Sequence, residues 1–215
     1  MLFGLVALAV LGVQRAVYIF VPGQLGAGFV TAAFPPIIAV LANIQTAADL
    51  RAAPLPLSEL FDLALTRLWA VIILDLVFYW SLGLGVEIML SSSSIGNWLA
   101  GLIAFMLAAT LIFADVYASV EPQPNRLRTL PLAIVRSVSL ACQNGNLARV
   151  FSLASLLMLI VVAGELLNQW VGAHHVRDAV FLGEVPFGTL VQAPLSALVT
   201  AVYLDSLARE RLRSA

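Results

Sequence analysis

Residues 95–117 read IGNWLAGLIAFMLAATLIFADVY, and the twenty residues before Asp115 carry no charged side chain. A membrane-spanning helix needs about 20 predominantly apolar residues, because the hydrocarbon core of a bilayer is about 30 Å thick. This stretch therefore predicts a transmembrane helix. Trp98 and Tyr117 lie near its two ends, where amphipathic rings favour the membrane interface.

Apolar blocks of similar length lie on both sides of this stretch. We expect six transmembrane helices, at residues 2–21, 25–48, 68–90, 95–117, 150–171 and 185–207. We expect Pro35-Pro36 to kink or split the second of them, because two backbone donors are missing there. The chain is 61% hydrophobic and 11% charged, whereas a soluble domain carries roughly 25% charged residues. These features predict an all-α membrane protein, with residues 1–215 forming a single polytopic domain.

Two mixed segments between the apolar blocks predict helices that lie at the membrane surface. The first is residues 58–67, with Ser58 as its N-cap. The second is residues 127–143, in which apolar side chains recur at steps of three or four while Arg128 and Arg136 lie on another side. We expect both to be amphipathic interfacial helices, and we expect Asn144-Gly145-Asn146 to end the second.

The arginines decide the expected orientation. The chain has eleven basic residues besides histidine, all of them arginine, and nine lie in the segments after spans two and four and in the C-terminal tail. Arg15 and Arg177 are the other two. Because positively charged loops stay in the cytoplasm, we expect both termini to be cytoplasmic and the arginines to attract anionic lipid headgroups. The net charge of −1 gives no reason to expect nucleic acid as a partner.

Asp75 is the most informative charge inside an expected span. It lies eight residues after Arg67, hence about 12 Å along a helix from the cytoplasmic end. A carboxylate there is costly, so we expect an intramembrane polar site formed by Asp75, Asn43 and Gln45. The two readings of Asp75 are a proton or cation site and a structural partner for a neighbouring polar group.

Other charges are expected to form structural ion pairs. Arg15 and Glu165 fall in the outer halves of spans one and five, where pairing offsets much of the cost of burial. Asp115 and Asp205 fall near the cytoplasmic ends of their spans, level with Arg136 and Arg149. We expect these last four residues to join the interfacial helices to the bundle.

The sequence gives no indication of catalysis. Cys142 is the one cysteine, which excludes an intramolecular disulfide and a cysteine-based metal site within one chain. His174 and His175 are adjacent, and adjacent histidines usually point apart; the sequence also has no His-x-x-x-His spacing and no nucleophile, phosphate-binding or metalloprotease motif. We therefore expect no catalytic residue, no cofactor and no bound metal.

The order of these features resembles six-span bacterial inner-membrane proteins of the YciC-like family and the membrane domains attached to some glycerophosphodiester phosphodiesterases. The likeness covers residues 25–213 and rests on three places: the segment 58–67, the segments 133–137 and 144–149, and Pro194 followed by Tyr203-Leu204-Asp205 and Arg209-Glu210-Arg211. It implies the six-span architecture and a bacterial inner-membrane location. It implies no phosphodiesterase activity, because this sequence has no such domain.

The expected function is that of a noncatalytic inner-membrane protein, either an accessory or scaffold subunit of a membrane complex or a factor in envelope homeostasis. Its expected partners are membrane lipids, including anionic headgroups, and other membrane-protein subunits. The alternative is a small lipid or solute transporter with a polar cavity around Asp75.

Overall fold

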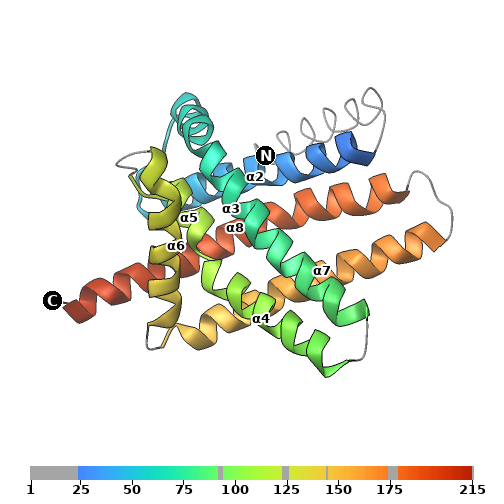
Figure 1. Cartoon of the computed structure of the whole chain (residues 1–215). Helices are drawn as coiled ribbons and strands as arrows, with labels where there is room; N and C mark the ends of the chain where they lie inside the picture. The colour runs from blue at the N-terminus through green and yellow to red at the C-terminus, as the bar shows by residue number, and fades with distance from the viewer. Residues whose placement is uncertain (1–23, 92–93, 123–125, 144, 174–178, 215) are drawn as a thin grey trace.

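The computed structural model describes residues 24–91, 94–122, 126–143, 145–173 and 179–214. Their side chains are described over 36–78, 94–122, 128–143, 145–160, 162–163, 166, 191 and 193–212. Every regular element in these ranges is a helix, so the expected all-α class is confirmed (Figure 1). The expected first span, residues 2–21, and the His174-His175 loop lie outside the described residues.

Helix α2 (Gln24–Leu50) corresponds to the expected second span. It continues through Pro35-Pro36, so of the two expected outcomes the split is wrong, and the kink stays a prediction. Proline keeps a helical φ and removes only its own backbone donor, and neighbouring helices can hold such a segment helical. Helices α3 and α8 pack along α2 and provide that support.

Helix α3 (Leu57–Ser91) corrects the expected boundary between an interfacial helix and the third span. Residues 58–67 and 68–90 form one continuous helix of 35 residues, about 52 Å long. No glycine or proline separates the two segments, and Ser58 lies inside the first turn and not before it. Leu60 and Ala64 are buried while Leu65 is exposed, so one face of this first segment packs on the bundle.

The expected fourth span is broken near its end. Helix α4 (Ile95–Leu111) begins at the N-cap Ser94, whose hydroxyl accepts from the Asn97 N–H, and α5 (Ala114–Val120) follows after a short turn. At the break, the Ser137 hydroxyl accepts from the Phe113 N–H at 3.0 Å and donates to the Thr110 carbonyl at 2.7 Å. A side chain inserted into the helical ladder in this way is an established cause of a helix break.

Helix α6 (Arg126–Cys142) matches the second expected interfacial helix within one residue at each end. Gly145 follows with φ 92°, a conformation that glycine adopts without strain, and Asn146 donates to the Leu140 carbonyl at 3.1 Å. The expected helix end at residues 144–146 is therefore confirmed. Helix α7 (Leu147–Ala173) corresponds to the fifth expected span, and helix α8 (Ala179–Ser214) corresponds to the sixth. Helix α8 continues through Pro194 and through the arginine-rich tail.

The helices form a bundle in which α2, α7 and α8 run along one another and α3 and α4 cross them obliquely (Figure 1). Helix α6 lies across the end of the bundle where α2 ends and α7 begins. The core of the bundle contains the rings of Phe113 and Tyr203, which pack at a tilt of 57° with their centroids 5.8 Å apart. Both side chains are fully buried.

Within the described residues, one stretch is long and apolar enough to cross a membrane by length and composition. It is Ile95–Val120, which comprises α4 and α5 and has a mean hydropathy of 2.2. Pro36–Leu50 and Leu147–Ile160 are shorter apolar helical stretches.

Candidate functional site: a buried polar core

Five polar residues from α2, α3, α5 and α8 meet inside the bundle, and we call them the polar core: Asn43, Asp75, Asp115, Ser119 and Thr200. Asn43 lies at the centre and has no solvent-exposed surface. Its amide donates to the Ser119 hydroxyl at 3.2 Å, and its carbonyl oxygen accepts from the Thr200 hydroxyl at 2.9 Å. Ser119 in turn donates to the Asp115 carbonyl at 2.7 Å. A single amide therefore links three helices.

The two carboxyl groups of the polar core have different surroundings. Asp115 accepts from the Val116 N–H at 2.8 Å, and the Asn43 amide lies within hydrogen-bonding reach of its carboxyl group. Asp75 is buried, and its Oδ2 has no hydrogen-bond partner among the described residues. Asp115 is nonetheless close enough to act electrostatically on Asp75.

Asp75 and Asp115 both line one small cavity of about 30 Å³. Among the described residues of its wall, Ser196 of α8 is the third polar one, and the others are apolar: Leu74, Phe78, Leu111, Ile112, Leu157, Leu195 and Val199. A cavity of this size holds one or two water molecules. It has no room for a lipid or an organic solute.

Arg67 of α3 contacts the polar core at Ser119. Its guanidinium donates to the Ser119 carbonyl, which α5 leaves without an intrahelical partner near its end. Burial lowers the pKa of Arg67, and the nearby Glu121 carboxylate opposes this shift. Arg51 pairs with Glu121 at 3.0 Å, so Arg67 and Arg51 share this acidic neighbour at the end of α5.

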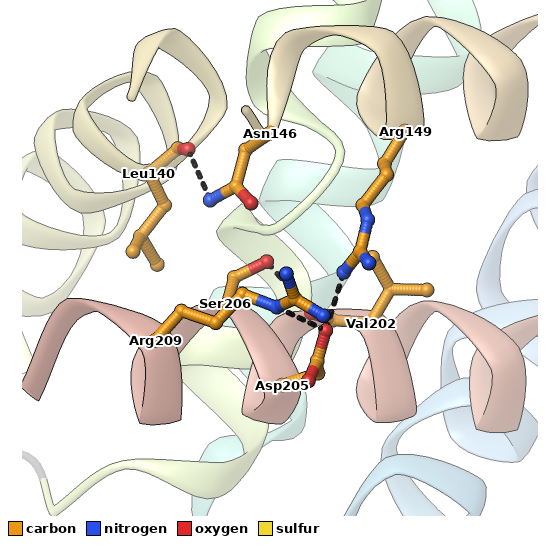
Figure 2. A network of polar contacts seen from close by, with 7 residues as sticks. All are labelled: Leu140, Asn146, Arg149, Val202, Asp205, Ser206 and Arg209. Atoms are coloured by element: carbon orange, nitrogen blue, oxygen red, sulfur yellow. Dashed lines mark hydrogen bonds and ion pairs between the residues drawn. The ribbon is translucent and has the colours of Figure 1, made fainter. Parts of the chain in front are cut away.

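A separate set of ion pairs joins α8 to α6 and α7. Figure 2 shows Asp205 between Arg149 of α7 and Arg209 of α8, and the Arg209 contact measures 2.8 Å. Arg136 of α6 contacts both carboxylate oxygens of Glu210, one of them at 2.9 Å. This contact holds the pKa of Glu210 below its ordinary value, so the pair persists at pH values where a free glutamate begins to protonate.

These contacts correct several expectations from the sequence. Gln45 does not belong to the polar core, because it is partly exposed and donates to Asp49 at 2.9 Å one helical turn away. Asp115 faces the cavity, and it forms no ion pair with a described arginine. Arg136 pairs with Glu210 and not with an aspartate. Arg149 and Asp205, two of the four charges expected together at this level, form an ion pair between α7 and α8, whereas Arg15 and the Glu165 side chain lie outside the described residues.

Sequence reasoning missed Ser119, Thr200 and Glu210. Serine and threonine are common in apolar helices, where they can bond to their own backbone, so neither stands out without a partner. Glu210 lies between Arg209 and Arg211 in a tail whose positive charge predicts an orientation in the membrane and no particular ion pair.

The fold and the site define the class of protein: an all-helical bundle with a hydrogen-bonded polar core and an ion-paired end. No protein-family model, no curated protein and no solved structure matches this chain. The resemblance to YciC-like membrane proteins and to phosphodiesterase-associated membrane domains therefore stays a prediction.

Proposed function

We propose that this chain is a six-span integral protein of a bacterial inner membrane with both termini in the cytoplasm. The supporting observation is the distribution of arginines over the bundle. The C-terminal ends of α2, α5 and α8 and the N-terminal end of α7 lie at one end of the bundle, whereas the C-terminal ends of α3 and α7 and the N-terminal ends of α4 and α8 lie at the other (Figure 1). Within the described side chains, the arginines are at positions 51, 67, 128, 136, 149, 209 and 211, all in segments at the first end. A bilayer oriented by the positive-inside rule has this end in the cytoplasm.

The orientation is tested by cysteine labelling of intact cells with a membrane-impermeant maleimide. Cys142 is exposed at the arginine-rich end, and we expect it to react only after the cells are permeabilised. Ile95 is 80% exposed at the opposite end, so Ile95→Cys in a Cys142→Ser background should react without permeabilisation. Reaction of both positions from the same side would contradict the six-span arrangement.

Within the membrane, we propose that the chain acts as a noncatalytic accessory subunit and binds another membrane protein through α4. The outer face of α4 carries apolar side chains along the helix, and they remain exposed in the described part of the chain. Trp98, Leu102 and Ile103 are 54%, 52% and 69% exposed. Leu99, Met106 and Leu107 belong to the same face and are 56%, 43% and 50% exposed. Such a face needs either lipid or a partner helix against it.

Small residues in this face favour a partner helix. Gly96, Ala100 and Ala104 recur every four residues, and the first two are exposed. A Cβ atom added at Gly96 would meet no other atom within 4 Å. In lipid, where apolar surface alone gives no preference for protein, small residues at this spacing promote association because they let two helix backbones approach closely. The occupant that fits is a transmembrane helix of another subunit.

The test compares Gly96→Leu and Ala100→Leu with Ala148→Leu. Both α4 positions face open space, so the larger side chains fit the isolated chain but hold a partner helix away. Ala148→Leu adds the same volume at an exposed position at the start of α7 and serves as the matched control. Purification from the native membrane in mild detergent should recover one further membrane protein in fixed ratio with the wild type and the control, and at least tenfold less with the α4 variants. Equal recovery with all four chains, or recovery of lipid alone, would exclude this interface.

A second candidate function, a small transporter, is favoured by the cavity at Asp75. Its volume of about 30 Å³ rules out a lipid or an organic solute as the occupant in this conformation. The candidate therefore narrows to transport of a proton or of a small cation.

A further inference from the structure

The carboxyl groups of Asp75 and Asp115 face a common cavity, and no described cation faces it with them. The described part of the wall is formed by α3, α5, α7, α8 and the end of α4, and Ser196 is the one other polar residue among the described residues that line it. The two arginines beside the polar core have other partners: Arg67 donates to the Ser119 carbonyl, and Arg51 pairs with Glu121. No described residue of α4 is charged. The charges with described side chains on α7 and α8 all lie toward the arginine-rich end: Arg149, Asp205, Arg209 and Glu210, which are in ion pairs, and Arg211.

Two ionised carboxylates sharing such a site repel each other, and each has lost most of its hydration. One bound cation between them removes the repulsion, and a single proton is sufficient. A hard metal ion such as Ca²⁺ takes six to eight oxygen ligands, and Mg²⁺ retains several waters. The cavity wall offers two carboxylates and one hydroxyl, with space for one or two waters, so it fits a proton better than a metal ion.

The hydrogen bonds show which carboxyl group carries the charge. Asp115 receives a backbone N–H at 2.8 Å and lies within reach of the Asn43 amide, and donors of this kind stabilise an ionised carboxylate. Asp75 receives no donor at its buried Oδ2 from any residue whose side chain the structure describes. A proton on Asp75 neutralises the carboxyl group that has no donor at Oδ2 among the described residues. The remaining negative charge is then on Asp115, which has the hydrogen-bond donors.

We propose that Asp75 and Asp115 form a proton-binding site inside the bundle, in which Asp75 holds an exchangeable proton and Asp115 is its ionised partner. In the binding step, a hydronium ion in the cavity transfers its proton to the Asp75 carboxylate, and a water molecule is left behind. Release is the reverse of this step. The inference is independent of association through α4, and it names the substrate, a proton, for the second candidate function.

The experiment is infrared difference spectroscopy of the full-length protein in lipid nanodiscs while the pH is stepped from acid to alkaline. The wild type should give the C=O stretch of a protonated carboxylic acid at neutral pH, with the expected isotope shift in D₂O. Asp75→Asn, which keeps the shape of the side chain, should lose this band. Asp115→Asn should keep the band, and its midpoint should move down by about one pH unit or more, because the repelling charge is gone. Asp205→Asn, at the exposed ion pair, should leave the band unchanged.

The outcomes separate the proposal from its alternatives. A wild-type spectrum without the band at neutral pH would overturn the proposal, and so would a band that persists in Asp75→Asn. An unchanged midpoint in Asp115→Asn would also overturn it, because the two groups would then not form one site. Loss of the wild-type band on addition of Na⁺ or Ca²⁺ at constant pH would mean that a metal cation is the preferred occupant and would overturn the choice of a proton. If association through α4 fails its test, these results are unaffected.

Discussion

Phe113→Ala should lower the free energy of unfolding by about 3–5 kcal/mol, which is the cost typical of removing a buried aromatic ring. Phe113 has no exposed surface and lies in the turn between α4 and α5, where its ring packs on Tyr203 of α8. Alanine leaves a void that the surrounding helices cannot close, because the Phe113 backbone is held by the Ser137 hydroxyl. In a membrane the lost contacts still count, since lipid cannot enter the void.

The measurement is equilibrium unfolding of the purified protein in mixed micelles of mild detergent and sodium dodecyl sulfate. Trp98→Ala is the matched control, because it removes a larger ring that is 54% exposed on α4, the helix just before Phe113. We expect the control to change stability by less than about 1 kcal/mol. Equal losses for the two variants would mean that Phe113 is not packed in the core as described.

Asn43→Ala should have the second largest effect, a loss of about 2–4 kcal/mol. The substitution removes the hydrogen bonds to Ser119 and Thr200 together, and it takes the amide away from the Asp115 carboxyl group. Ser119 and Thr200 are both fully buried, and each then loses the hydrogen bond that it shares with the Asn43 amide. Because the partners lie on α5 and α8, the packing of α2 against both helices should also loosen.

Gln45→Ala, two residues further along α2, is the control for this prediction. Gln45 is a side-chain amide like Asn43, but it is partly exposed and bonds only to Asp49 on its own helix. We expect a change within about 0.5 kcal/mol. In the same unfolding experiment, a loss for Gln45→Ala as large as that for Asn43→Ala would show that the effect comes from α2 itself and not from the polar core.

The expected helices outside the N-terminal block are present, because each apolar block is long and bounded by polar, glycine or proline residues. The boundaries that were wrong have a common cause. Residues 58–67 and 68–90 form one helix because no glycine or proline lies at the boundary between them. Local sequence marks a helix end only where a residue that stops a helix is present. The split expected at Pro35-Pro36 does not occur, because α3 and α8 pack along α2.

The polar core was predictable only in part. Asp75 and Asn43 were selected because polar groups inside apolar helices must find partners, and that argument holds for both. Gln45 was selected on the same ground but is near enough to the end of α2 to bond with Asp49. The position of Asp115 along the chain predicts an ion pair with an arginine at the same level, but its position around the helix axis places it in the wall of the cavity.

By itself, the sequence determined the helical class, the approximate extent of most helices and the confinement of nearly all arginines to alternate connecting segments, because these properties depend on residues that are neighbours along the chain. The tertiary structure alone decided that Ser137 breaks the helix between α4 and α5, and that Asp75 shares a cavity with Asp115. It also decided that Thr200 bonds to Asn43, 157 positions earlier in the chain. Contacts of this kind depend on how far each helix is rotated about its axis, and that rotation is set by packing against the other helices.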